Sequence, residues 1–316
     1  MAAPRVLLPH HVGIDRASAI AARLSETIDG EVDVARSPAE TRAGIGDARI
    51  LATSRSPNAL FEDAERLEWL HLLTAGVDHV DLDRLAARDV VVTNSSGVHA
   101  EPIAEQVLWY LLTFERRLDE AIANAEDDRW QRVEGGELRG KTVGIVGVGA
   151  IGTRIAELCS ALGTTVLGTK RDLDSMPAAV DEAIPAEGYH ELLRRAEYVV
   201  LACPLTAETN GMIGADEFGI MGDETVLVNV GRGEICDESA LIRALRSGRI
   251  RGAGLDTFTT EPLPADSPLW NLPNAVLTPH MAGSTPRKPE RWCELIATNY
   301  ESFRDDDRDA MVNRVV

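Results

Sequence analysis

The feature that most constrains this chain is a glycine-rich turn between a strand-like run and a helical run. Gly147, Gly149 and Gly152, with Ala150 and Ile151 between the last two, follow the apolar run 142–146 and open a helical run that reaches residue 162. In such a turn the first glycine permits the tight bend, the second lets the backbone approach a phosphate, and the third allows close helix–strand packing. The first N–H groups of the helix attract negative charge. Strand, turn, helix and next strand occur in order within about 30 residues, which predicts a dinucleotide-binding turn.

Short apolar runs alternate with helical runs along most of the chain. Residues 5–97 contain the strand-like runs RVLLP, EVDVA, ARILAT, WLHLLTA and VVVTNSS, and a second alternating series occupies residues 142–280. This alternation predicts α/β architecture with parallel sheets covered by helices on both faces. A chain of 316 residues is long enough for two such domains. The run 102–125 has no Gly or Pro after Pro102 and predicts one long helix.

Acidic residues are in large excess in this chain. Asp and Glu number 51 against 32 Lys and Arg, the net charge is −19, and only three residues are lysine. Such a surface repels phosphate, so we expect neither nucleic acid nor an anionic membrane as a partner. The composition suggests a halophilic protein, because concentrated salt screens the self-repulsion of the carboxylates. A codon bias that replaces Lys by Arg is the alternative, but it would not explain the excess of acids.

The sequence carries no signal for export or membrane insertion. No apolar run approaches the roughly 20 residues that span a bilayer, and residues 1–9 lack the basic and apolar regions of a signal peptide. We therefore expect a cytoplasmic protein. The four cysteines lie far apart without a CxxC spacing, so we interpret them as small core residues and predict no metal site.

The end of the strand that follows the glycine turn carries positive charge. An Asp or Glu at this position normally binds the ribose 2′-hydroxyl of NAD, whereas this chain has Lys170 and Arg171 and no acid before Asp172. Two cations here favour a 2′-phosphate, and lysine is scarce elsewhere in the chain. The sequence therefore predicts a preference for NADP(H), with NAD(H) also possible.

Three later motifs are NVGRG at 229–233, LDTFTTEP at 255–262 and LTPHMAGST at 277–285. Together with LLTAGVDHVDLD, VVTNSSGVHAEPIAE and LACPLTAETNGMI, they make the chain resemble the D-isomer-specific 2-hydroxyacid dehydrogenases. The resemblance extends through most of the chain, with the motifs in the family's order. It implies reversible reduction of a small 2-oxo acid to the D-2-hydroxy acid.

The resemblance assigns the catalytic roles to Arg232, Glu261 and His280. The fork-shaped cation of Arg232 can bind the substrate carboxylate or its 2-oxo oxygen. Protonated His280 can contact the same oxygen and donate a proton to it as hydride reaches C2. Glu261 is expected to orient the imidazole and favour its charged form.

The same resemblance implies further contacts and an architecture. The N–H groups of Ala75 and Gly76 would bind the substrate carboxylate. A flavodoxin-like substrate domain, residues 1–97 and 281–316, would form a cleft with a Rossmann domain, residues 98–280, and a homodimer would form through the Rossmann domain. The residues expected along the dinucleotide, besides the glycine turn, Lys170 and Arg171, are Ile103, Pro204, Thr209, Val230, Asp256 and Gly283.

Several alternatives stay open. A formate dehydrogenase would pair its histidine with glutamine, and this chain has Glu261. A phosphoglycerate dehydrogenase is less favoured because no regulatory extension follows Val316. Glyoxylate or hydroxypyruvate reduction is the strongest alternative within the family. From another class, corepressors of the same fold sense a dinucleotide and act as protein-binding modules.

Overall fold

The computed structural model describes residues 3–54, 58–61, 63–77 and 80–316 and divides into two compact units. Unit 1 consists of Met1–Val98 and Thr285–Val316, and unit 2 of His99–Ser284. These boundaries lie one and four residues beyond those expected from the sequence. Near the second boundary, Gly283 accepts a hydrogen bond from the ring of His99, at 3.1 Å, and both residues lie in unit 2.

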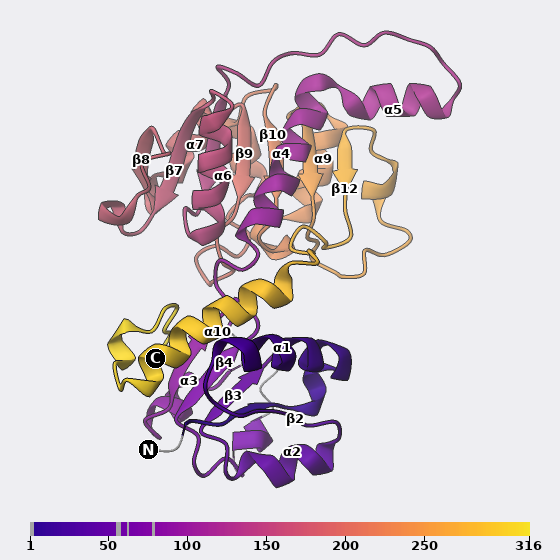
Figure 1. The fold of residues 1–316 in the computed structure, drawn as a ribbon. Coiled ribbons are helices and arrows are strands. Elements are labelled where there is room, and N and C mark those ends of the chain that lie inside the picture. The colour runs from indigo at the N-terminus through magenta and orange to yellow at the C-terminus, as the bar shows by residue number, and fades with distance from the viewer. Residues whose placement is uncertain (1–2, 55–57, 62, 78–79) are drawn as a thin grey trace. The chain divides into compact units, whose positions relative to one another are not determined.

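Unit 1 is built on a parallel sheet of five strands in the order β2-β1-β3-β4-β5. This is the flavodoxin-like order, and the five strands are those predicted from the sequence. The C-terminal helix α10 packs against α1 over this sheet (Figure 1). The elements of unit 1 are β1 Val6–Leu8, α1 Ile14–Thr27, β2 Val32–Val34, α2 Pro38–Ile45, β3 Ile50–Thr53, β4 Trp69–Leu72, α3 Leu82–Ala86, β5 Val91–Asn94 and α10 Lys288–Arg304.

Unit 2 is built on a parallel sheet of seven strands in the order β12-β11-β10-β9-β6-β7-β8. The strand order reverses between β6 and β9, which is where open α/β sheets bind ligands. The strand β8, exposed at three of its four residues, was not predicted. The elements of unit 2 are α4 Ala100–Arg116, α5 Leu118–Glu126, β6 Thr142–Val146, α6 Ala150–Ala161, β7 Thr165–Lys170, β8 Glu182–Pro185, α7 Tyr189–Arg195, β9 Tyr198–Leu201, α8 Ala215–Ile220, β10 Val226–Asn229, α9 Glu238–Arg246, β11 Gly252–Leu255 and β12 Ala275–Leu277.

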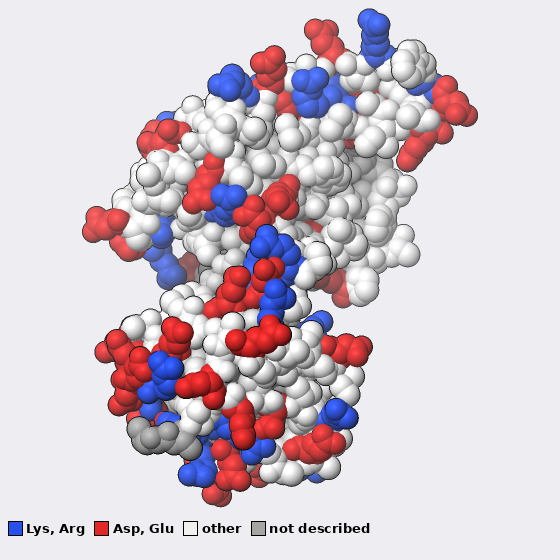
Figure 2. All heavy atoms as spheres, viewed as in Figure 1, with Lys and Arg blue, Asp and Glu red and all other residues white. Residues whose placement is uncertain are grey.

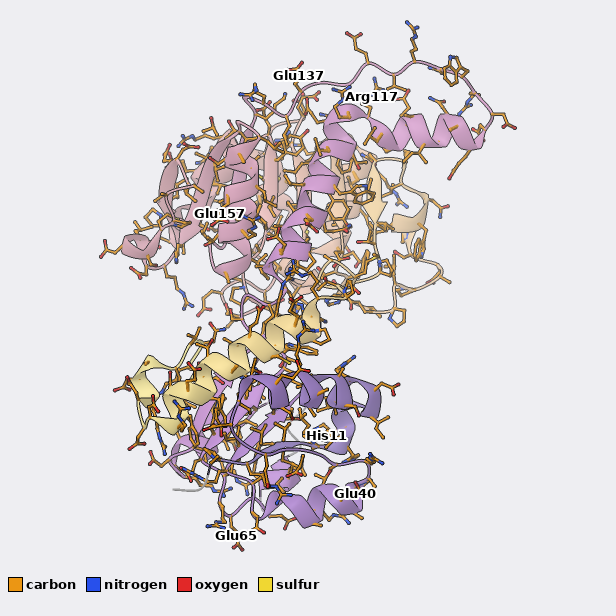
Figure 3. All side chains as sticks on the ribbon, in the orientation of Figure 1. His11, Glu40, Glu65, Arg117, Glu137 and Glu157 are labelled. Atoms are coloured by element: carbon orange, nitrogen blue, oxygen red, sulfur yellow. The ribbon has the colours of Figure 1, made fainter. Side chains whose placement is uncertain are left out.

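The prediction of one uninterrupted helix over residues 102–125 is wrong. The helix breaks at Arg117, which has left-handed backbone angles (φ 51°, ψ 43°) and separates α4 from α5 (Figure 3). Two carbonyls of the last turn of α4 are bound by distant partners. The N–H of Gly136 donates to the Glu115 carbonyl at 2.8 Å, and the guanidinium of Arg251 donates to the Phe114 carbonyl. These tertiary hydrogen bonds replace the helical ones. The sequence has no Gly or Pro at this position that would predict the break.

A continuous polar chain crosses the core of unit 1 at His71. The Trp69 Nε1–H donates to the Thr93 hydroxyl at 2.8 Å, so the hydroxyl hydrogen can point to Nδ1 of His71, also at 2.8 Å. Nε2 of His71 then carries the hydrogen and faces the Ser95 hydroxyl at 3.2 Å, which donates to the Leu72 carbonyl at 2.8 Å. Each of these polar groups has a hydrogen-bond partner while the His71 ring is neutral. None of the partners is an anion that would stabilise a charged ring.

Acid is expected to destabilise unit 1 through His71. Burial lowers the pKa of this fully buried ring from 6.5 to about 3. Below pH 6.5 the unfolded chain binds a proton that the folded chain does not, so this part of the stability is lost as pH falls, by about 1.4 kcal/mol per pH unit. The free energy of unfolding, measured with urea, should fall between pH 7 and pH 5 by about 2 kcal/mol more in the wild type than in His71→Gln. The variant has no group at this position that titrates in this range. Equal changes in both proteins would contradict the prediction.

On the face drawn in Figure 2, acidic residues lie on both units, with basic residues among them. Many of the arginines form ion pairs, such as Arg195 with Glu182 at 2.6 Å and Arg154 with Glu101 at 2.6 Å. The dependence of folding on salt concentration, which the net charge leads us to expect, stays a prediction.

The four cysteines are buried and unpaired, as expected. Among the residues described, no helix is long and apolar enough to cross a membrane.

Candidate active site

The glycine turn has the geometry that its sequence predicts. Gly147 has a φ of 98°, and a Cβ there would lie 2.6 Å from the Cα of Cys203. A Cβ on Gly152 would lie 2.3 Å from the Gly147 carbonyl oxygen, so α6 packs directly on the turn. A Cβ on Gly149 would meet nothing within 4 Å, so the backbone here borders open space. No side chain among the described residues caps α6 at Gly149, which leaves its first N–H groups available to an anion.

The end of β7 is hydrogen-bonded to this turn. Thr169 accepts from the Gly147 N–H through its hydroxyl, at 3.1 Å, and from the Val148 N–H through its carbonyl, at 2.9 Å. The next residue, Lys170, therefore lies beside the glycine turn. Its Nζ donates to the Ser175 carbonyl at 2.8 Å, and Arg171 is exposed. Both cations are at the carboxyl edge of the sheet, as predicted.

The loop after β9 reaches the same edge. The Thr209 hydroxyl donates to the Pro204 carbonyl at 2.7 Å and accepts from the Thr206 N–H at 2.8 Å, so the two residues predicted to line the dinucleotide close one turn. The Thr206 hydroxyl donates to Glu208 at 2.6 Å. This bond, with the nearby charge of Arg171, holds the pKa of the Glu208 carboxyl below its ordinary value.

The apolar residues expected near the dinucleotide gather in one cluster. Ile103 of α4 and Val230 after β10 are buried with Val148 of the glycine turn and with Ala282. Gly283 follows Ala282 directly and is bound to His99 as described above. Residues from four distant segments of unit 2 thus lie together.

Arg232 is set in a rigid turn at the end of β10. The Asn229 side chain donates to the Arg232 carbonyl at 2.9 Å and accepts from the Gly231 N–H at 3.1 Å. On the other side, a Cβ on Gly233 would lie 2.0 Å from the carbonyl carbon of Phe258. Only glycine lets this turn touch the segment that leads to Glu261. The NVGRG motif is therefore explained by close backbone packing around one arginine.

Glu261 and His280 form a hydrogen-bonded pair, with Nδ1 of the ring 2.7 Å from Oε2 of the carboxylate. The other carboxylate oxygen accepts from the Phe258 N–H at 3.0 Å. Partial burial disfavours the charged form of Glu261. The hydrogen bonds from His280 and Phe258, with the charges of His280 and Arg232, outweigh burial and hold the pKa of this carboxyl below its ordinary value. The second ring nitrogen of His280, Nε2, has no hydrogen-bond partner among the described residues, and 48% of the side chain is exposed.

Asp256 fixes the loop that carries His280. It is buried, and its carboxylate accepts from the Met281 and Ala282 N–H groups, both at 2.9 Å, and from the Thr278 hydroxyl at 2.5 Å. These bonds hold the loop while His280 adopts a left-handed φ of 49°. Asp256 was expected beside the dinucleotide, and its contacts within the chain show a positioning role that the sequence did not indicate.

Ala75 and Gly76 lie in unit 1, in the loop that follows β4. None of the described residues accepts a hydrogen bond from the N–H group of either. Both N–H groups are thus available to a ligand within the described part of the chain. The predicted substrate-binding residues Arg232 and His280 are in unit 2.

Unit 2 thus combines a dinucleotide-type glycine turn at the switch point of a parallel sheet with a carboxylate-paired histidine and a neighbouring arginine. This combination defines the class as a nicotinamide-dependent oxidoreductase.

Comparison with known proteins gives the family. The model of the D-isomer specific 2-hydroxyacid dehydrogenase NAD binding domain matches residues 108–282. A glyoxylate reductase of Thermococcus litoralis is 34% identical over 264 residues, which are 80% of this chain and 78% of the relative. A D-3-phosphoglycerate dehydrogenase of Methanocaldococcus jannaschii is 33% identical over 266 residues, 81% of this chain but 50% of that protein. The chain belongs to the D-isomer specific 2-hydroxyacid dehydrogenase family.

Solved structures of the family have the same architecture. A D-isomer specific 2-hydroxyacid dehydrogenase family protein from Aeromonas salmonicida is 30% identical with a TM-score of 0.83, over 100% of this chain and 99% of that one. An NADPH-dependent glyoxylate/hydroxypyruvate reductase from Sinorhizobium meliloti, in complex with NADP and malonate, is 29% identical with a TM-score of 0.76, over 100% and 97% of the two chains. The predicted fold class, two α/β domains with parallel sheets, is confirmed.

Proposed function

We propose that this chain reduces a small 2-oxo acid to the D-2-hydroxy acid, with NADPH as the preferred reductant and glyoxylate or hydroxypyruvate as the first candidate substrates. The observation that carries the proposal is the Glu261–His280 pair at 2.7 Å, beside the charge of Arg232. The bound nicotinamide supplies hydride to C2, or accepts it in the reverse direction. The named relatives that reduce glyoxylate and hydroxypyruvate support the choice of substrates.

In this proposal each group of the site has a defined role. His280, protonated at Nε2 and held through Nδ1 by Glu261, gives a proton to the 2-oxo oxygen as negative charge develops there. Arg232 neutralises the substrate carboxylate or the same oxygen. The N–H groups of Ala75 and Gly76 bind the carboxylate. Asp256 keeps the His280 loop in place and stays a candidate contact of the dinucleotide.

The dinucleotide assignment is supported by the fit of unit 2 to the group. The open space at Gly149 and the uncapped start of α6 suit a pyrophosphate. Lys170 and Arg171 at the end of β7 suit a 2′-phosphate, and the Sinorhizobium meliloti reductase is described with NADP. These observations favour NADP(H) over NAD(H).

A substrate panel tests the proposal. The purified protein is mixed with NADPH or NADH and glyoxylate, hydroxypyruvate, pyruvate, 3-phosphohydroxypyruvate or a longer 2-oxo acid, and the loss of nicotinamide absorbance is followed at several salt concentrations. Turnover of at least one 2-oxo acid is expected, with a D-configured product where the product is chiral. Tight dinucleotide binding without any turnover would favour the binding-module alternative.

We also propose that the chain forms a homodimer through unit 2. Helix α5 leaves the end of α4, and the segment after it arches back to the sheet (Figure 1). No apolar side chain of α5 is buried, and a nine-residue helix is marginal without packing. A second copy of the chain would supply that packing. The large apolar side chains exposed on α4, α5 and this segment are Trp109, Leu112, Leu118, Ile122 and Trp130.

Replacement of Ile122 by aspartate is expected to dissociate this dimer. Ile122 is 55% exposed in the single chain, and a twofold interface would contain it twice. Loss of its burial in both copies should weaken association by at least about a hundredfold. Sedimentation velocity over a concentration series measures the effect. Ile14→Asp, at an isoleucine of unit 1 that is 48% exposed, is the matched control and should leave the dimer intact. A monomeric wild type would contradict the proposal.

A further inference from the structure

Two consecutive carbonyls in the loop after β4 are held by residues at the end of β5. The Ser95 N–H donates to the Thr74 carbonyl at 3.0 Å, and the Asn94 side chain donates through Nδ2 to the Ala75 carbonyl at 2.7 Å. In a trans peptide the C=O and the following N–H point in opposite directions. The N–H groups of Ala75 and Gly76 are therefore turned away from the residues that hold the carbonyls.

A third carbonyl of the loop is fixed from within. The Thr74 hydroxyl donates to the Gly76 carbonyl at 3.0 Å, which turns the N–H of Val77 away as well. None of the described residues accepts a hydrogen bond from Val77 N–H. Successive N–H groups without acceptors among the described residues are a feature that suits an anion.

The amide of Asn94 has a defined orientation in this arrangement. Its Oδ1 accepts from the Ser96 N–H at 3.0 Å, and a backbone N–H can only donate. Its Nδ2 must then face the Ala75 carbonyl, which can only accept. Asn94 is thus a bridge between β5 and the loop, with one side-chain atom that donates and another that accepts.

The C-terminal tail holds Asn94 in turn. The Asn94 N–H donates to the Asn313 carbonyl at 3.1 Å, and the Asn313 side chain donates to the carbonyls of Asn94, at 3.3 Å, and Ser96, at 2.8 Å. The tail continues along the edge of β5, where the Val315 N–H donates to the Val92 carbonyl at 2.7 Å. The last residues of the chain are therefore linked to the loop through Asn94.

We propose that Asn94, held by Asn313 of the C-terminal tail, is a positioning residue that presents the N–H groups of Ala75 and Gly76 to the substrate carboxylate. The inference rests on the proposed function, which assigns the carboxylate to these two N–H groups. Asn94 does not touch the substrate and acts through the Ala75–Gly76 peptide. Its removal lets this peptide rotate, so that fewer N–H groups face the anion.

Kinetics with glyoxylate and binding of oxalate, an unreactive carboxylate, test this role in the full-length protein. Asn94→Ala is expected to raise KM for glyoxylate and Kd for oxalate in parallel, by about ten- to a hundredfold, the effect of losing one hydrogen bond to a charged group. Turnover at saturation and the Kd for NADPH, measured by its fluorescence, should not change. Asn94→Asp keeps the acceptor for Ser96 N–H but loses the donor for the Ala75 carbonyl, so it should weaken oxalate binding at least as much.

Two variants in the tail separate positioning from general stability. Asn313→Gly removes the side chain but suits the left-handed φ of 58° at this position, so the tail can keep its path. It should raise KM by a smaller factor than Asn94→Ala, in the same direction. Arg314→Ala, the matched control, removes an exposed ion pair with Asp309 in the same tail and should leave KM unchanged.

The outcomes distinguish this inference from the proposed function. Unchanged KM and oxalate affinity in Asn94→Ala would overturn the inference, and so would equal losses of kcat, NADPH affinity and melting temperature, which indicate a structural role only. If the wild type reduced no 2-oxo acid but bound oxalate, and Asn94→Ala weakened that binding, the proposed function would fail and the positioning role would stand.

Discussion

Replacement of His280 by alanine is expected to lower the turnover number for 2-oxo acid reduction by about 10²- to 10⁴-fold, the usual contribution of general acid catalysis. The affinity for the dinucleotide should stay the same, because the residues that fit the cofactor lie on the glycine turn and at the end of β7. Steady-state kinetics and NADPH fluorescence titration measure the two quantities. His190→Ala is the matched control, since that histidine also pairs with a carboxylate, Glu217, at 3.0 Å. Wild-type turnover in His280→Ala would overturn the catalytic assignment.

Glu261→Gln should do less damage than His280→Ala and should change the pH dependence of the rate. The variant keeps a hydrogen-bond acceptor for Nδ1 of His280 but removes the negative charge 2.7 Å from the ring. Protonated His280 then lacks its counter-charge, so more acid is needed to protonate it. The pH profile of reduction is expected to move toward lower pH. A profile identical to that of the wild type would show that Glu261 does not tune His280.

The wild type is expected to prefer NADPH over NADH by about ten- to a hundredfold in kcat/KM. A charge-assisted hydrogen bond contributes about 1.5–3 kcal/mol, and Lys170 and Arg171 can each form one with a 2′-phosphate. Exposure and salt reduce this sum. In addition, one of the three N–H donors of Lys170 is already bound to the Ser175 carbonyl at 2.8 Å. The measurement is kcat/KM for both cofactors at matched salt, and a preference for NADH would show that the two cations are ordinary loop residues.

Two kinds of variant are expected to change the preference for NADPH in opposite directions. Lys170→Asp, alone or with Arg171→Ala, should reduce or reverse the preference, because the new carboxylate repels the phosphate and offers the ribose hydroxyl an acceptor. Glu208→Gln should increase the preference for NADPH, because it removes the negative charge near Arg171. Both variants should leave His280 and its pairing unaffected, so turnover with saturating cofactor serves as the control.

The sequence by itself determined those features that depend on neighbouring residues. Of the twelve strands in the described part of the chain, eleven fall on apolar runs of the sequence. The tight turn at Gly147 and the close packing at Gly152 follow from steric limits that glycine alone relaxes. Arg232, Glu261 and His280 could be singled out because each lies in a distinctive motif at the end of a strand. The carboxyl ends of parallel strands meet at one edge of a sheet, so their proximity in unit 2 was predictable. Strand β8, exposed at three of its four residues and without an apolar run, gave no such signal.

Only the tertiary structure decided which distant group satisfies each backbone N–H and C=O. The break at Arg117 exists because Gly136 and Arg251 bind the last carbonyls of α4. Asp256 belongs to the His280 loop because its carboxylate meets N–H groups that are 25 and 26 residues away in the chain. The Asn94 side chain binds the Ala75 carbonyl, 19 residues before it, and its own carbonyl is bound by Asn313, 219 residues after it. Such partners are chosen by the packing of whole elements, because most buried backbone groups must be paired and several local sequences offer equivalent partners.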